Sequence, residues 1–384
     1  MKVAILTTDS REHYKDYENR EPSFGAAPEA LLQGFAQLPE LEVHVLSCAR
    51  AKMSSPSKLA PNIFFYSLYV PKLGWMRTGY QGCLRAVRKT LRAIQPDIVH
   101  GQGTEHDCAI SAVFSGFPNV VTIHGNMAEL ARLFRARVGS FSWLAARLEN
   151  FTLKRTAGVF CNSAYTEQLV KPRTPRTWRV PNPLREQFFA PSVEPPPSRK
   201  CALVNVGLVT PRKRQLELLD VARALRQQGL DFEFQFIGQA TPNNPYAEAF
   251  FERIRPMEKE GFARYSGLKP THELIQALDA ASALIHFPSE EAFGLVVAEA
   301  LARDLKFFGA RVGGIPDIAD KVPEAELFGV DDWHGLTSGI GQWIRRGYLR
   351  AAGAAPIMRA RYHPEVIARR HLEIYRAVLQ GPGI

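Results

Sequence analysis

Short apolar runs alternate with amphipathic stretches along the whole chain, and this alternation limits what the chain can fold into. The short apolar runs favour buried strands, and the longer amphipathic stretches between them favour helices. Alternation of this kind is typical of open parallel sheets covered by helices. The strands expected in the first half are Lys2–Thr7, Glu42–Ser47, Asp97–His100, Val120–Ile123 and Val159–Asn162. The helices expected there are Pro28–Leu38, Cys83–Ile94 and Phe141–Arg155.

The alternation stops between residues 181 and 197, where six prolines occur in PNPLREQFFAPSVEPPP. Proline fixes φ and lacks an N–H donor, so neither a helix nor a central strand continues through this segment, and we place the linker here. The alternation then resumes. The strands expected beyond it are Ala202–Val206, Phe232–Ile237, Ala283–Phe287 and Lys306–Gly309. The helices expected there are Gln215–Gln228, Ala247–Glu260, Leu295–Ala302 and Pro364–Leu379.

The pattern therefore predicts two α/β domains joined by a linker, with a ligand cleft between them. An N-terminal domain covers residues 1–190, and a C-terminal domain covers residues 191–363. A last helical segment, residues 364–384, returns to pack on the first domain. The length of 384 residues is sufficient for two hydrophobic cores.

Composition excludes several classes of protein. The five cysteines are widely spaced and odd in number, which argues against a disulfide framework or a structural zinc site and favours a reducing cytoplasm. No run of 18 apolar residues is present, so no membrane span is expected. Lys+Arg minus Asp+Glu is 24 − 15 = +9 over residues 1–190 and 24 − 23 = +1 over residues 191–384. The basic half suits an anionic partner, or it is simply a solvated face.

The stretch from Ala283 to Asp317 carries the strongest chemical signal. Glu291 follows a predicted buried strand, and Glu299 lies eight residues later, inside a predicted helix. On one helix the two carboxylates would stand about 12 Å apart. Retaining glycosidases need about 5 Å between their two carboxylates, so these two should have separate roles. The N–H groups at the start of the helix suit a phosphate.

These residues and their spacing resemble the donor-site signature of retaining glycosyltransferases of the GT-B fold, family four. The similarity lies densely in the second half and thinly in the first. Its segments are Thr122–Gly125, Val180–Asn182, Val206–Gly207, Pro211–Lys213, Phe236–Gly238, Ser266–Gly267, Pro288–Ser289, Glu291, Phe293–Gly294, Glu299 and Gly313–Pro316. The resemblance implies two Rossmann-like domains that face a cleft, with a C-terminal helix that crosses back to the first domain.

The resemblance also implies a role for each matching residue. Glu299 would bind the ribose of a nucleotide-sugar, Glu291 the donor sugar, and Lys213 the departing diphosphate together with nearby backbone N–H groups. The implied catalytic residues are His124, Lys213 and Glu291. The implied donor-binding residues are Gly207, Arg212, Lys213, Gly267, Leu268, Lys269, Glu291, Ala292, Phe293, Gly294, Leu295 and Glu299. Gly25 and Ala26 would form a loop on the acceptor side. The resemblance implies no metal or other cofactor, and the absence of an Asp-x-Asp pair agrees with metal-independent transfer.

Simpler interpretations stand beside each of these assignments. The two glutamates could lie on a solvated helix face, His124 could be a core histidine, and Arg212–Arg214 could be a basic helix start. The chain also departs from the family pattern, with Leu208 in place of the usual arginine and a single glycine, Gly25, in place of the usual pair. A catalytically silent sugar-nucleotide or glycan binder and a sugar-nucleotide epimerase therefore remain alternatives.

The expected activity is retaining transfer of a sugar, with UDP as the favoured carrier, to a hydroxyl of a glycan or lipid-linked acceptor in envelope polysaccharide or glycolipid synthesis. No nucleic-acid partner is expected. The segment Lys72–Arg92 mixes basic residues with Trp75, Met76 and Tyr80. This mixture suits docking on an anionic membrane at the cytoplasmic face, or an amphipathic helix with a basic outer side.

Overall fold

The computed structural model describes residues 1–191 and 200–381. The chain divides into two compact units: unit 1 comprises residues 1–185 and 362–384, and unit 2 comprises residues 186–361. The predicted borders, at 190/191 and 363/364, lie close to these divisions. The end of the proline-rich segment, residues 192–197, lies outside the described residues.

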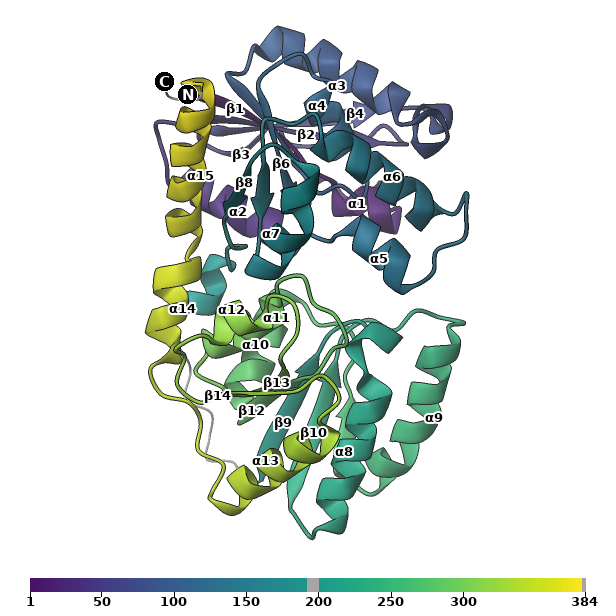
Figure 1. The fold of residues 1–384 in the computed structure, drawn as a ribbon, viewed down its shortest axis with the longest axis vertical. Coiled ribbons are helices and arrows are strands. Elements are labelled where there is room, and N and C mark those ends of the chain that lie inside the picture. Colours follow the sequence, from purple (N-terminus) through teal and green to yellow (C-terminus); the bar gives the residue numbers. More distant parts are fainter. Residues whose placement is uncertain (192–199, 382–384) are drawn as a thin grey trace. The chain divides into compact units, whose positions relative to one another are not determined.

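Unit 1 is built on a sheet whose described strands number eight, in the order β3-β4-β2-β1-β5-β6-β7-β8 (Figure 1). The strands are β1 (Lys2–Leu6), β2 (Glu42–Ala49), β3 (Lys58–Ala60), β4 (Ile63–Tyr69), β5 (Ile98–Gln102), β6 (Asn119–Ile123), β7 (Val159–Cys161) and β8 (Thr177–Arg179). The helices are α1 (Ser10–Tyr14), α2 (Ala26–Ala36), α3 (Gln81–Ile94), α4 (Cys108–Val113), α5 (Met127–Leu133), α6 (Phe141–Leu153), α7 (Ala164–Val170) and α15 (Pro364–Leu379). Every pair of neighbouring strands is parallel except β3 and β4.

Unit 2 is built on a parallel sheet whose described strands number six, in the order β11-β10-β9-β12-β13-β14. The strands are β9 (Cys201–Val206), β10 (Phe232–Ile237), β11 (Ala263–Tyr265), β12 (Ala283–His286), β13 (Lys306–Ala310) and β14 (Ala325–Phe328). The helices are α8 (Gln215–Gln227), α9 (Pro245–Lys259), α10 (Thr271–Ala280), α11 (Leu295–Leu301), α12 (Ile315–Ala319), α13 (Trp333–Arg345) and α14 (Ala354–Tyr362).

The C-terminal helix α15 is part of unit 1, as predicted. Its apolar side enters the core of unit 1 through Ile367, Leu372 and Tyr375, and it packs against α2. The two helices meet where α2 carries Gly34. A Cβ at that position would stand 2.2 Å from the carbonyl oxygen of Pro364, so only glycine permits this approach.

Each predicted strand and helix is present, with bounds that differ by a few residues. The prediction omitted strands β3, β4, β8, β11 and β14 and helices α1, α4, α5, α7, α10, α12, α13 and α14. Most of the missed strands lie at or next to a sheet edge and are short. Such strands are only half-buried and keep polar residues, so their apolar signal in the sequence is weak.

Candidate functional site

The sheet of unit 2 reverses its strand order between β9 and β12. Strands β10 and β11 follow on one side of β9, whereas β12, β13 and β14 lie on the other. The described register between β9 and β12 ends at the pair Leu284–Val204. Just beyond it, the side-chain amide of Asn205 donates to the carbonyl of Ile285 at 2.8 Å. Ligands of open α/β sheets bind at the carboxyl ends of the strands at such a reversal.

The loops that follow these two strands bring Lys213 and Glu291 together. A 3-10 turn after β9, Pro211–Lys213, presents the Lys213 ammonium, and its Nζ forms an ion pair with Glu291 Oε2 in the loop after β12. The two side chains are only 12% and 13% exposed. The backbone N–H of Ser289 donates to the carbonyl of Arg212 at 2.9 Å, which ties the loops to each other.

His286, the last residue of β12, is a site residue that the sequence prediction missed. Its Nε2 lies 3.2 Å from Glu291 Oε2. Its Nδ1 is buried and has no hydrogen-bond partner among the described residues. The available signal was its place at the carboxyl end of a buried strand, the same signal that singled out His124 in the first half.

The charges of this group follow from burial and from Lys213. Burial alone would raise the pKa of Glu291, but the Lys213 ammonium and the hydrogen bond to His286 hold it well below its usual range. Burial, together with the Lys213 charge, lowers the pKa of His286 to about 4. Near neutral pH the site therefore holds an ionised Glu291 beside a neutral His286.

The neighbouring arginines have different anchors. Arg212 Nη1 lies 3.2 Å from Glu290 Oε2 and stays beside the Lys213 pair. Arg214 turns to another loop, where its Nη1 donates to the carbonyl of Val330 at 2.7 Å. Leu208, which stands where the family has arginine, is about half-exposed. Of these two arginines, Arg212 is therefore the one that lies next to the site residues.

Two glycines shape the loop that carries Glu291. Gly313 has φ +55°, and a Cβ there would stand 1.7 Å from the carbonyl oxygen of Glu291. The N–H of Gly314 donates to that same carbonyl at 3.0 Å. Gly294, at φ +102°, precedes α11, whose first two residues, Leu295 and Val296, present their backbone N–H groups at the start of the helix.

The other predicted donor residues surround this group in unit 2. Glu299 is buried on α11, and Phe293 is buried just before that helix. Ala292 and Leu295 are half-buried on either side of Phe293 and Gly294. Gly207 follows β9 at the reversal and packs against Gly238, which follows β10.

The remaining donor segment, Gly267 to Lys269, follows β11 and is the part of the set farthest along the sheet from β12. The carbonyl of Gly267 accepts from the N–H of Gly238 at 2.8 Å. Leu268 is largely exposed, and Lys269 pairs with Glu273 at 3.0 Å.

His124 and the predicted acceptor loop belong to unit 1. His124 follows β6, and its Nε2 lies 2.9 Å from Gln102 Oε1; burial lowers its pKa to about 4. The Glu105 carboxylate accepts from the N–H of Gly125, the residue after His124, at 3.1 Å. Gly25 and Ala26 stand at the start of α2. Gly25 is sterically unconstrained, since a Cβ there would meet only Pro28 Cδ, at 3.7 Å.

A separate buried cluster in unit 1 joins Cys48, Cys83 and Asp107, with potential ligand atoms within 4.8 Å of one another. Both cysteines are members of the apolar core. The hydrogen bond with Cys83 and burial raise the pKa of Cys48 well above its usual value, and burial raises the pKa of Asp107 to about 6. Near neutral pH the Cys48 thiol therefore stays protonated, whereas Asp107 is mostly ionised and can accept a hydrogen bond from it.

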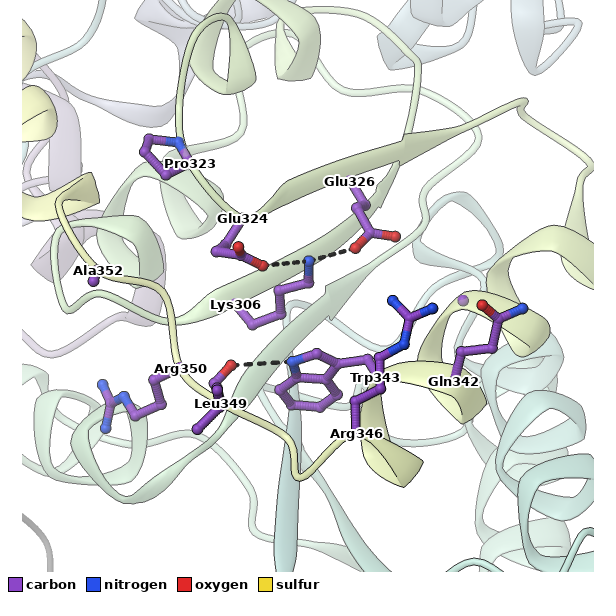
Figure 2. Close-up of a pocket in the computed structure, with 11 residues that line it drawn as sticks. Lys306, Pro323, Glu324, Glu326, Gln342, Trp343, Arg346, Leu349, Arg350 and Ala352 are labelled. Atoms are coloured by element: carbon purple, nitrogen blue, oxygen red, sulfur yellow. Dashed lines mark hydrogen bonds and ion pairs between the residues drawn. The ribbon is translucent and has the colours of Figure 1, made fainter.

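A pocket of about 400 Å³ lies in unit 2 near the amino ends of strands β13 and β14, whereas the site at the strand reversal lies at carboxyl ends of strands. Figure 2 shows Lys306 between Glu324 and Glu326, and the Trp343 indole N–H donating to the carbonyl of Leu349. Lys306, Glu324 and Glu326 stand at the amino ends of β13 and β14, Trp343 lies in the last turns of α13, and Leu349 follows that helix. No predicted donor residue lines this pocket, so it is distinct from the site at the strand reversal.

The segment Lys72–Arg92 contains an amphipathic helix with a basic outer side, which is the simpler of the two interpretations of its sequence. Trp75 and Tyr80 are buried, and the Trp75 indole N–H donates to the carbonyl of Val70 at 3.0 Å. Helix α3 packs on the sheet by an apolar side and exposes Arg85 and Lys89. The aromatic side chains of this segment are therefore not presented to a membrane. Among the described residues, no helix is both long and apolar enough to cross a bilayer.

Comparison with known proteins places the chain in a family. Residues 30–186 match Glycosyltransferase Family 4, and residues 187–353 match Glycosyl transferases group 1. No curated protein sequence matches the chain.

Solved structures share the fold over the whole chain. Sucrose-phosphate synthase from Thermosynechococcus elongatus is 16% identical with a TM-score of 0.78, and the match covers 100% of both chains. Anabaena HepE in complex with UDP is 15% identical with a TM-score of 0.71, over 98% of this chain and 100% of HepE. The lipopolysaccharide outer core galactosyltransferase WaaB is 14% identical with a TM-score of 0.69, over 98% of this chain and 100% of WaaB. Together with the two family matches, which follow one another along the sequence, these likenesses show that the chain belongs to the family-four, group 1 glycosyltransferases with the GT-B fold.

Proposed function

We propose that this protein is a retaining glycosyltransferase that transfers a sugar from a UDP-sugar to a hydroxyl of a glycan or lipid-linked acceptor, without a metal ion. The observation that carries the proposal is the buried Lys213–Glu291 ion pair at the strand reversal of unit 2. HepE, which shares the fold, has been solved in complex with UDP-glucose, and this supports the choice of carrier.

Lys213 would bind the diphosphate of the donor. A diphosphate carries more negative charge than one carboxylate, so it competes with Glu291 for the ammonium. The N–H groups of the first turn of α11 lie in the same loop region and suit phosphate oxygens. As the bond between the sugar and the diphosphate breaks, these donors stabilise the charge that develops on the leaving group, without a Lewis acid.

Glu291, freed from Lys213, would accept hydrogen bonds from the donor sugar, with the neutral His286 holding its carboxylate in place. Glu299 would bind the ribose hydroxyls, and residues 267–269 would border the base. His124 and the loop at Gly25 and Ala26 would contact the reacting sugar or the acceptor. A carboxylate that accepts from hydroxyl groups makes strong, directional hydrogen bonds, which suits recognition of a sugar.

The proposal is tested by nucleotide release from UDP-, GDP- and ADP-sugars in the presence of EDTA. We expect release from UDP-sugars alone, and NMR of the product should show a retained anomeric configuration. Glu299→Ala should raise the donor KM by about ten-fold or more, since a hydrogen bond to a charged group contributes about 1.5–3 kcal/mol. Loss of release on chelation would contradict the metal-independent step.

Two other outcomes would identify the alternatives. Donor-induced thermal stabilisation without release or transfer, with any acceptor offered, would indicate a silent binder, an interpretation motivated by Leu208. Isomerisation of the donor sugar without nucleotide release would indicate an epimerase. The proposal includes a role in the synthesis of envelope polysaccharides or glycolipids at the cytoplasmic face of a membrane. Transfer of the sugar to acceptors bound in vesicles tests this role.

A further inference from the structure

Unit 1 exposes a group of large apolar side chains around the connection between α5 and α6. We call residues 132–155 the α5–α6 surface; the two helices pack on each other and are joined by residues 134–140 (Figure 1). Phe134 is 60% exposed and Val138 is 81% exposed. Leu133, Phe141 and Phe151 are exposed as well. Leu133, Phe134 and Val138 stand close together along the chain, at the end of α5 and in the connection, and exposed apolar side chains gathered in this way mark a surface for interaction.

The fold holds these side chains outward. Ser140 caps α6 by accepting from the N–H of Trp143, and α6 buries Ala145, Glu149, Thr152 and Leu153 on its inner side. Phe151 lies on the other side of the helix and stacks on Phe114, and Phe141, in the first turn, lies beside His106. The Glu149 carboxylate accepts from the N–H of Met127 at 2.9 Å and so joins α6 to the start of α5. The surface is therefore preformed.

The charge of the same surface is strongly positive. Residues 132–155 contain five arginines, one lysine and one acidic residue, Glu149, which is buried and paired with Arg173 at 2.8 Å. Neither Arg135 nor Arg137 forms an ion pair within the described part of the chain, and both are exposed. The Arg155 guanidinium lies 3.6 Å from the centre of the Phe151 ring. Basic and apolar side chains thus alternate along the exposed connection between the two helices.

We propose that the α5–α6 surface docks on an anionic lipid bilayer, with Phe134 and Val138 entering the interface and Arg135 and Arg137 meeting lipid phosphates. Apolar side chains flanked by arginines, with no exposed acid, have the composition of an interfacial membrane contact. A protein surface that binds nucleic acid stacks the bases on aromatic rings. The aliphatic side chains of Leu133 and Val138 provide no surface for such stacking.

The docking site also relates to the proposed reaction, and this part of the inference depends on the proposed function. Helix α5 begins at Met127, three residues after His124. Contact of this surface with a bilayer brings the turn that carries His124 close to the lipid headgroups, where the sugar of a lipid-linked acceptor lies. The segment Lys72–Arg92, by contrast, buries its Trp75 and Tyr80.

Co-sedimentation with vesicles tests the docking. The full chain should bind vesicles that contain phosphatidylglycerol and bind pure phosphatidylcholine far more weakly. Arg135→Ser with Arg137→Ser should weaken binding by about 25-fold, since each basic residue near an anionic surface contributes about five-fold. Phe134→Ser with Val138→Ser should also reduce binding strongly.

Matched control variants remove basic or apolar side chains of the same type from other parts of the protein surface. Arg85→Ser with Lys89→Ser removes two charges from α3, and Leu349→Ser removes an exposed apolar side chain from unit 2. Each control should change binding by no more than about two-fold. Equal loss in the controls and in the α5–α6 variants would overturn the proposal, as would absence of binding in the wild type. Concentration-dependent dimerisation that is abolished by the Phe134 and Val138 changes would assign the surface to a second copy instead.

The docking proposal and the proposed activity can be disproved independently of each other. Nucleotide release from a UDP-sugar in solution should be the same in the wild type and in the Phe134→Ser/Val138→Ser variant, while transfer to a vesicle-bound acceptor falls in the variant. Vesicle binding without any nucleotide release would remove the proposed function and leave the docking intact.

Discussion

At the scale of single residues, Glu290 and Glu291 show how two adjacent carboxylates acquire opposite properties. Burial raises the pKa of Glu290 despite the nearby Arg212. Burial has the same direction at Glu291, but Lys213 and His286 outweigh it and lower the pKa. Environments that push the pKa values of neighbouring groups apart are characteristic of working sites.

Lys213→Ala tests the role of this charge. Turnover should fall by about 10²- to 10³-fold, the usual cost of removing a group that stabilises developing negative charge, while the donor KM changes less. Because Lys213 lowers the pKa of Glu291, its removal should move the acid limb of the pH–rate profile to higher pH. Arg214→Ala is the matched control, since this neighbouring cation is held by Val330; its turnover should stay near that of the wild type.

Gly313→Ala tests the backbone beneath Glu291. Gly313 and Gly267 both have left-handed backbone, at φ +55° and +67°, but only Gly313 faces a neighbour, the carbonyl of Glu291. Gly267→Ala should lower the free energy of unfolding by about 1–2 kcal/mol. Gly313→Ala should cost about 1–3 kcal/mol more, because the added Cβ displaces the loop. Equal midpoint shifts in urea unfolding would show that this close contact has no importance.

At the scale of elements, helix α15 and strand β5 are joined by a hydrogen bond between two buried side chains in the core of unit 1. His100 Nδ1 lies 2.5 Å from the Tyr375 hydroxyl, and His371 stacks on Phe160 with ring centres 4.6 Å apart. Burial lowers the pKa of His371 to about 4 and that of His100 well below its usual value. Both histidines are therefore neutral in the folded unit.

The stability of unit 1 should consequently fall as pH drops from about 6.5 towards 4. In that range the unfolded chain binds protons at these histidines whereas the folded chain does not, and above it neither state does. A pKa lowered from 6.5 to about 4 corresponds to about 3 kcal/mol at the acid end.

The measurement is the melting temperature against pH for wild type and His371→Phe. The phenyl ring preserves the stack on Phe160 but cannot titrate, so the curve of the variant should be flatter between pH 6.5 and 4. A variant curve parallel to that of the wild type would rule out His371 as a source of the acid sensitivity.

At the scale of the whole molecule, unit 1 is assembled from both ends of the chain. A chain that ends at His363 lacks α15 and therefore lacks Ile367, Leu372 and Tyr375 from the core. Each such side chain contributes about 1.5–3 kcal/mol on burial, and their sum is comparable to the stability of a typical domain.

We therefore expect the chain that ends at His363 to lose the cooperative unfolding of unit 1 and to keep that of unit 2. Calorimetry should show one transition in place of two, and exchange of backbone amides should be fast throughout residues 1–185. A chain that ends at Gln380 keeps the whole of α15 and should behave as the full chain does. Two transitions in the shorter chain would show that α15 is dispensable.

Local pattern was sufficient to predict the two α/β units, the central strands and the main helices. Glu291 was singled out by its spacing from Glu299 and its position after a visible buried strand, whereas the role of Lys213 followed from the resemblance to the family. His286 was not predicted, since one histidine at a strand end has no spacing signal of its own. The membrane hypothesis placed at Lys72–Arg92 depended on Trp75 and Tyr80 being exposed, and sequence composition does not report which way a ring points.

By itself, the sequence determined what depends on neighbours along the chain: where strands and helices form, where proline ends them, and which loops carry charged residues. Only the tertiary structure decided which of those loops meet. The Lys213–Glu291 pair joins residues 78 positions apart, and His100 and Tyr375 are 275 apart. Such contacts arise from strand order and from burial, which set both the partners of a side chain and its pKa. The exposed α5–α6 surface has the same origin, because which apolar residues stay outside is known only once the core is full.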